Sequence, residues 1–146
     1  MKNLVSDADN TDNRLPNSNA NVVKLAPLGS ESPYSLVEAK GVCSVVIVSY
    51  KTGEVLMDCI RSVLRQSKLH QLILVDNGNT RQTVQQLNEI ADKNSKFEII
   101  TGHGNVGFSK GCNLGVRRAR GEYILLLNPD SILQIDTLIP ALEVFQ

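Results

Sequence analysis

From about residue 43 onward, short runs of apolar residues alternate with longer segments in which apolar residues recur every three or four positions. The runs are SVVIVSY (44–50), LILVD (72–76), FEII (97–100) and YILLLN (123–128). Near-continuous apolar runs of this length are typical of strands that are covered on both faces. Each run therefore predicts a strand of a buried sheet.

Helical spacing of apolar residues predicts four helices between and after these strands. The helices carry, in chain order, Val55, Leu56, Cys59, Ile60, Val63 and Leu64; Val84, Leu87, Ile90 and Ala91; Phe108, Cys112, Val116 and Ala119; and Ile135, Leu138, Ile139, Leu142 and Phe145. Gly121 is expected to stop the third helix, and Asp136 to cap the last one, with Pro140 near its first turn. The strict alternation of strand and helix predicts an α/β fold, with a mostly parallel sheet and helices on both faces.

Residues 1–41 have a different character. They are rich in Asn, Asp and Ser and show no sustained apolar period, apart from Val22, Val23, Leu25 and Leu28, which are able to dock locally. Such a segment buries too little apolar surface to offset the entropy of ordering it. The sequence therefore divides into a disordered or loosely ordered segment, 1–41, and one folded unit, 42–146.

Composition narrows the function. The 146 residues include 15 basic and 15 acidic side chains and no Trp, which argues against nucleic acid binding. Three cysteines without a C-x-x-C pair are expected to be small buried residues in a reducing compartment. No signal peptide is visible, and the apolar stretch YILLLNPDSIL (123–133) is too short and too polar to span a bilayer, so a cytoplasmic location is expected.

The segment TGHGNVGFSKG (101–111) contains G-x-G-x-x-G and admits three interpretations. As a dinucleotide-binding fingerprint it would use Asp130 for the ribose, but two β-α units precede it and only one short helix follows Asp130. Alternatively, the glycines simply make a tight turn. The third interpretation is an anion site, because exposed N–H groups at a helix start with Lys110 nearby favour a phosphate-bearing ligand.

Taken together, four motifs resemble the family-2 glycosyltransferases with the GT-A fold. They lie in SVVIVSYKTGEVLMDCIRSVLRQ, LILVDNG and HGNVGFSKGCNLGVRRARGEYILLLNPD, so the resemblance runs from about Cys43 to Ser131. It is closest to the rhamnosyltransferase-like subgroup, which carries Asn-Pro-Asp where others have Asp-x-Asp. The resemblance implies transfer of a sugar, such as rhamnose, from a nucleotide diphosphate to an acceptor hydroxyl, with inversion at the anomeric carbon.

The same resemblance implies roles for residues at the strand ends. Ser49 and Tyr50 align with the segment that borders the nucleotide base, and Asp76 aligns with the carboxylate that accepts a hydrogen bond from base N3–H. Asn105 and Gly107 align with the loop over the nucleotide sugar, where glycine permits close backbone approach. On local sequence alone, Asp76 is equally well explained as a turn residue.

Further along the chain, Asn113 aligns with a helical polar position that faces the site, and Lys110 is placed to help neutralise the diphosphate. Asn128 and Asp130 align with the metal motif, which implies Mg²⁺ or Mn²⁺. On local sequence alone, Lys110 is also explained as a solvated surface residue, and Asn-Pro-Asp as a plain turn. Relatives place Ser and Asp after the Asn-Gly pair, so the contacts of Asn79 and Thr80 stay open.

No residue is assigned as the catalytic base, which in the family lies in the following half. The resemblance therefore implies a donor- and metal-binding half of a truncated GT-A domain, with an unpaired sheet edge and an uncovered apolar face. Expected partners are a UDP- or dTDP-sugar and a saccharide or lipid-linked acceptor, the latter at the inner membrane face. The alternatives are a non-catalytic remnant that self-associates through the exposed sheet edge, and an NAD-binding domain.

Overall fold

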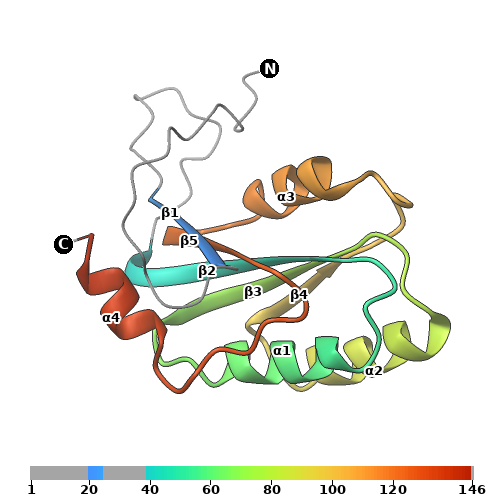
Figure 1. Cartoon of the computed structure of the whole chain (residues 1–146), viewed down its shortest axis with the longest axis horizontal. Helices are drawn as coiled ribbons and strands as arrows, with labels where there is room; N and C mark the ends of the chain where they lie inside the picture. The colour runs from blue at the N-terminus through green and yellow to red at the C-terminus, as the bar shows by residue number, and fades with distance from the viewer. Residues whose placement is uncertain (1–19, 25–38, 146) are drawn as a thin grey trace.

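The computed structural model of the chain describes residues 20–24 and 39–145. In chain order its elements are β1 (Ala20–Lys24), β2 (Ala39–Ser49), α1 (Val55–Leu64), β3 (Leu69–Asp76), α2 (Arg81–Ala91), β4 (Phe97–Ile100), α3 (Phe108–Val116), β5 (Gly121–Leu127) and α4 (Leu138–Glu143) (Figure 1). The predicted α/β class and the alternation of strands and helices from β2 to α4 are confirmed. None of the helices in the described part of the chain combines the length and the apolarity that crossing a membrane requires.

The strands form one sheet in the order β1-β5-β2-β3-β4. Strands β5, β2, β3 and β4 are parallel, and β1 is antiparallel to β5. In register, Ser49 of β2 pairs with Asp76 of β3, and Ile47 of β2 pairs with Leu127 of β5. The carboxyl ends of these strands therefore meet at one edge of the sheet.

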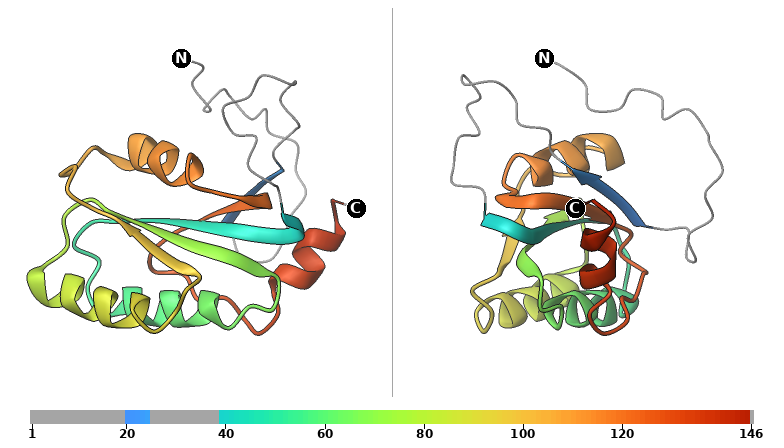
Figure 2. Two further views of the ribbon diagram at one scale, coloured as in Figure 1. Left: turned by 180° about the vertical axis from the view of Figure 1, so that it is seen from behind. Right: turned by 90° about the vertical axis from the view of Figure 1, so that its left-hand side faces the viewer.

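Helices cover both faces of the sheet. Helices α1, α2 and α4 lie on one face and α3 lies on the other (Figure 1; Figure 2 shows the same layers from behind and from the side). Val45 and Ile47 belong to the larger core with α1, α2 and α4, whereas Val46 and Val48 belong to the clusters beneath α3. Burial on both faces explains why β2 reads as a continuous apolar run rather than as an alternating one.

Helix α3 packs unusually close to β2 because two of its buried residues are glycines. A Cβ atom on Gly115 would lie 2.3 Å from Val46 Cγ1, and one on Gly111 would lie 2.8 Å from Val48 Cγ1. At the start of the helix, the Asn77 side chain donates a hydrogen bond to the Gly107 carbonyl at 3.1 Å. These contacts hold the N-terminal end of α3 beside the carboxyl end of β3.

Two expectations about helix ends are wrong. Gly121 does not stop α3, which ends before it; Gly121 begins β5, where a Cβ atom would lie 2.7 Å from Ser44 N. Asp136 does not cap α4, whose N-cap position is Thr137. Instead Asp136 has a φ of 55°, and its Oδ1 accepts hydrogen bonds from Ser67 N and Oγ at 3.4 and 2.8 Å. In both cases the residue makes a contact with a distant part of the chain instead of the helix-end role that its local preference suggests.

The N-terminal part also differs from expectation. Ala20–Lys24 forms β1 and pairs with Tyr123–Leu127, and β2 begins at Ala39, inside the segment expected to be loosely ordered. Strand β1 therefore covers the side of β5 that faces away from β2, and β1 and β4 are the edge strands of the sheet within the described residues. The rest of 1–38 lies outside the described residues. Apolar side chains do remain uncovered elsewhere, with Ile132, Ile135 and Val144 more than half exposed.

The three cysteines behave as expected. Cys43, Cys59 and Cys112 are all free and buried. Burial raises the pKa of the Cys43 and Cys59 thiols to about 12, and it also raises the pKa of Cys112. They are therefore protonated, unreactive parts of the core near neutral pH.

We expect Gly115→Ala to destabilise the protein by about 1–3 kcal/mol, because the added methyl group overpacks against Val46. Urea denaturation measures the free energy of unfolding. Ser109→Ala, at an exposed position of the same helix, is the control and is expected to change it by less than about 0.5 kcal/mol. Equal effects of the two substitutions would contradict the close packing of α3 on β2.

Candidate functional site

The loops that follow the four parallel strands are gathered at one edge of the sheet. Neighbouring strands are about 4.8 Å apart, so β3 and β5, which lie on either side of β2, end about 10 Å from each other. Asp76 is the last residue of β3, and Asp130 follows β5 by three residues. The two predicted carboxylates therefore belong to the same edge of the sheet.

Asp76 uses its two oxygens differently. The residue is only 8% exposed, and Oδ1 accepts hydrogen bonds from Gly78 N at 3.0 Å and from Asn79 N and Nδ2, both at 2.8 Å. Oδ2 accepts no hydrogen bond from the described residues, and it is not among their buried unpartnered atoms. The turn role and the ligand role of Asp76 are thus compatible, because each needs a different oxygen.

Ser49 and Asn79 join the loops after β2 and β3. Ser49 is fully buried, and its hydroxyl donates to Asn79 Oδ1 at 3.1 Å and lies 2.8 Å from Thr52 Oγ1. Asn79 Oδ1 also accepts from Thr52 N at 3.3 Å. The buried side chain of Ser49 therefore links the loop after β2 to the loop after β3. Asn79, left open by the sequence, is a central contact of this cluster, and Thr80 caps α2 by accepting a hydrogen bond from Thr83 N.

Tyr50 directly follows β2, and its ring lies beside the turn that follows β3. The residue is 50% exposed, and the Lys51 ammonium lies 5.2 Å from the ring centroid. A Cβ atom on Gly78 would lie 3.4 Å from Tyr50 Cε2. The aromatic ring is therefore next to the turn that Asp76 organises.

The glycine loop lies beside this turn. Asn105 Oδ1 accepts a hydrogen bond from Gly107 N at 2.9 Å, and Gly107 has a φ of 80°, which favours glycine. Asn77, which the sequence analysis did not single out, is 3% exposed and binds this loop through Nδ2, while its Oδ1 is buried without a partner. Lys110 is exposed in the first turn of α3, and Asn113 is half-buried one turn later.

The Asn-Pro-Asp motif forms a turn at the end of β5. Ser131 N donates to the Asn128 carbonyl at 3.2 Å, and the Cys59 thiol donates to the same oxygen at 3.5 Å. Burial, with a smaller contribution from the Asp130 charge, holds the pKa of the Cys59 thiol at about 12, so it remains a donor. Asp130 itself is exposed and forms no hydrogen bond or ion pair with the described residues. Its carboxylate is therefore available to a ligand.

The oxygen atoms at the carboxyl ends of the strands fit a cation that is held jointly by the protein and a ligand better than one held by protein side chains alone. Within residues 20–24 and 39–145, no group of three or more His, Cys, Asp and Glu side chains is placed to hold a metal. Asp130 offers a carboxylate and Asn128 an amide oxygen. Mg²⁺ is usually held by one or two carboxylates and completes its coordination with water and substrate phosphates. The residues present therefore fit a cation that arrives with a diphosphate.

Comparison with known proteins decides the family. The profile that describes glycosyl transferase family 2 matches residues 44–146, which is most of the chain. The chain belongs to glycosyl transferase family 2. Among curated members, it is 29% identical over 92 residues to glycosyltransferase GlyG of Streptococcus pneumoniae, a match that covers 62% of this chain and 31% of GlyG.

Several solved structures share its fold. The 1–349 fragment of Staphylococcus aureus TarS in complex with UDP gives a TM-score of 0.60 at 23% identity, covering 68% of this chain and 30% of the fragment. The same fragment has been solved with UDP-GlcNAc. The mannosyltransferase PcManGT of Pyrobaculum calidifontis, in complex with GDP-Man and Mn²⁺, gives 0.58 at 14% identity and covers 73% and 33%.

These likenesses establish the GT-A fold for this member of family 2. The chain spans about a third of the length of the relatives it matches. The sequence analysis assigned no catalytic base, and none is assigned on the described residues. Asn77, which the sequence did not single out, and Asn79, whose contacts it left open, follow an Asp at a strand end, and that position is the signal that could have found them.

We expect Asp76→Ala to destabilise the fold by on the order of 2–4 kcal/mol, because three hydrogen-bond donors of the turn lose their common acceptor. Asp76→Asn keeps an oxygen in that position and is expected to cost roughly 1 kcal/mol. Urea denaturation of the two variants checks the order. Equal losses would mean that Oδ1 does not organise the turn.

Proposed function

We propose that this chain binds the nucleotide diphosphate sugar donor of a sugar transfer reaction, together with a divalent cation. The observation that carries the proposal is the arrangement of two carboxylates at one edge of the sheet. Asp76 keeps Oδ2 free beside the exposed ring of Tyr50, and Asp130 keeps both oxygens free at the end of β5. Membership of family 2 and the nucleotide ligands of the TarS and PcManGT structures support this assignment.

The base would lie between Tyr50 and Asp76. An exposed aromatic ring offers a stacking surface, and a carboxylate oxygen is an acceptor-only group that suits an imide N–H. Uracil and thymine both present N3–H, so the chemistry favours UDP or dTDP. The turn that fixes Oδ1 also fixes the direction of Oδ2, so the acceptor is oriented before the ligand arrives.

The sugar and diphosphate would follow the edge of the sheet from β3 toward β5. Asn105 and Gly107 would lie over the nucleotide sugar, and the first N–H groups of α3, with Lys110 and Asn113 nearby, would favour the negative charge of the phosphates. Asp130 and Asn128 would hold Mg²⁺ or Mn²⁺. When bound, the cation supplies positive charge to the leaving diphosphate.

The finer features of the reaction rest on the Asn-Pro-Asp motif and on the family. We propose rhamnose as the donor sugar, inversion at the anomeric carbon, and a saccharide or lipid-linked acceptor reached from the cytoplasmic side of a membrane. The general base is left unassigned. Neither alternative function gains support from a specific observation: nothing among the described residues indicates self-association through an edge strand, and the family match speaks against an NAD-binding domain.

We expect UDP to bind at least about tenfold more tightly with Mn²⁺ than with EDTA, because a cation held by Asp130 would supply positive charge to the diphosphate. Asp130→Ala is expected to remove this gain and to leave the affinity in EDTA unchanged. Isothermal titration calorimetry measures both affinities. Glu143→Ala, which removes an exposed carboxylate from α4, is the control and is expected to behave like the native protein. A metal-dependent gain that survives Asp130→Ala would overturn the assignment of the cation site.

We expect Asp76→Asn to exchange the preference for UDP for a preference for CDP. The three donors of the turn keep the amide oxygen in the position of Oδ1, so the NH₂ group replaces Oδ2. That group repels uracil N3–H but donates to cytosine N3, which is an acceptor. Competition between UDP and CDP measures the change, expected to be about tenfold or more. An unchanged ratio would show that Asp76 does not contact the base.

A further inference from the structure

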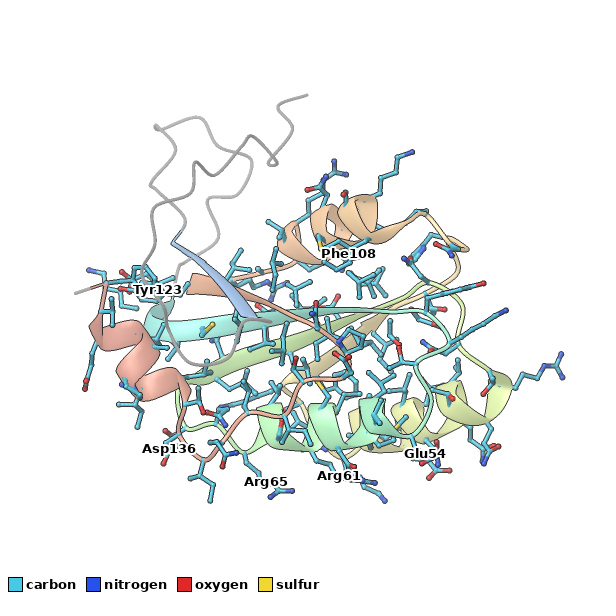
Figure 3. All side chains as sticks on the ribbon, viewed as in Figure 1. Glu54, Arg61, Arg65, Phe108, Tyr123 and Asp136 are labelled. Atoms are coloured by element: carbon cyan, nitrogen blue, oxygen red, sulfur yellow. The ribbon has the colours of Figure 1, made fainter. Side chains whose placement is uncertain are left out.

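One face of α1 carries buried polar side chains where a helix against a sheet normally presents apolar ones. Ser62 lies on this face and Gln66 follows the last residue of α1, Leu64, by two positions; they are 6% and 3% exposed, and the fully buried thiol of Cys59 lies one turn before Ser62. Their neighbours Arg61 and Arg65 point away from the sheet (Figure 3). Buried polar groups are retained in a fold when they have specific partners, so the partners of this face indicate its purpose.

Both polar atoms of the Gln66 side chain form hydrogen bonds, with a distant segment and with α1, the helix that precedes Gln66. Nε2 donates to the Gln134 carbonyl at 2.7 Å and to the Ser62 carbonyl at 3.1 Å, and Oε1 accepts from Leu138 N at 3.2 Å. The contacts with Gln134 and Leu138 span 68 and 72 residues of sequence. One buried side chain thus clamps the backbone at both ends of the stretch that leads into α4.

Ser62 and Cys59 continue the same row toward the Asn-Pro-Asp motif. The Ser62 hydroxyl donates to the Cys59 carbonyl at 2.7 Å and accepts from Leu133 N at 3.0 Å. The Cys59 thiol donates to the Asn128 carbonyl. The face of α1 therefore contacts the backbone on both sides of Asp130, at residues 128 and 133.

The segment after Asp130 has few other contacts before Asp136, which accepts hydrogen bonds from Ser67. Residues 131–134 belong to no helix or strand. Ile132 and Ile135 are 61% and 80% exposed, so they contribute little burial. Hydrogen bonds from buried donors and acceptors are accordingly the main restraint on the backbone that presents the Asp130 carboxylate, with Leu133 packed against the core as the apolar addition.

We propose that Ser62 and Gln66 are positioning residues for the cation site. By holding the backbone at Leu133, Gln134 and Leu138, they keep the Asp130 carboxylate in place for a cation-bound diphosphate. The proposal rests on the proposed function, in which Asp130 binds the cation. Groups that orient a metal ligand typically change metal affinity by about 10–100-fold when they are removed, and a preoriented ligand avoids an entropic cost at binding.

The test compares Gln66→Met with Gln82→Met. Methionine has a similar length but cannot form the three hydrogen bonds, and Gln82 is exposed on α2 and forms none with the described residues. Calorimetry gives the affinity for UDP with Mn²⁺ and with EDTA. We expect the metal-dependent gain to fall about tenfold in Gln66→Met, with the affinity in EDTA within about twofold of the native value. Gln82→Met should leave both affinities unchanged.

The outcomes separate this proposal from the proposed function. A native protein without a metal-dependent gain overturns both. A native gain that Gln66→Met retains, or an equal loss of affinity with and without Mn²⁺, overturns the positioning role alone, because the second result is what a general loss of structure would cause. Ser62→Ala, which removes only the contact with Leu133 N and with the Cys59 carbonyl, gives the same test if Gln66→Met does not fold.

The electron paramagnetic resonance spectrum of bound Mn²⁺ is a second measurement, and it does not depend on the free energy of unfolding. With UDP present, a well-fixed Asp130 gives the native protein one narrow set of coordination parameters. We expect a broader distribution in Gln66→Met and in Ser62→Ala, and an unchanged spectrum in Gln82→Met. Spectra identical to that of the native protein in both Gln66→Met and Ser62→Ala would contradict the positioning role.

Discussion

Parallel pairing of β2 with β3 on one side and β5 on the other is the constraint on which the site depends. Parallel strands end on the same edge of a sheet, so Asp76 and the Asn128–Asp130 turn emerge on either side of β2 without any special loop geometry. The apolar runs form strands that are buried on both faces. The positions of these strands also decide where the polar residues that follow them lie. The sequence pattern thus determines the strands, and the parallel pairing of the strands determines where the site residues lie.

The loops at that edge are held by side chains bonded to backbone rather than by apolar packing. Asp76 organises its own turn, Asn77 ties the glycine loop to β3, and Gln66 clamps the segment after Asp130. On the opposite face, the glycines of α3 allow the helix to approach β2, which brings its N-terminus to the same edge. Each of these contacts restricts a loop, as a preorganised site requires, and Asp76 Oδ2 and the Asp130 carboxylate accept no hydrogen bond from the described residues.

The sequence predicted the parallel strands, the helices and the strand ends, because continuous apolar runs and helical stripes carry that information directly. It did not predict β1, since Val22 and Val23 alone form too short a pattern. Gly121 and Asp136 misled because their local preferences for helix ends give way to tertiary contacts. Ser62 and Gln66 escaped notice because a helical stripe is recognised by its apolar members, and their partners lie about 70 residues away.

The most direct test of a shared edge is paramagnetic broadening of backbone amide signals by Mn²⁺ in the presence of UDP. We predict that the amide signals of residues 76–79, 105–110 and 130–131 broaden together, while those of Phe97 at the far end of β4 and Glu143 in α4 remain sharp. Broadening confined to one of the three groups, or centred on α4, would contradict a single site built from the carboxyl ends of β3, β4 and β5.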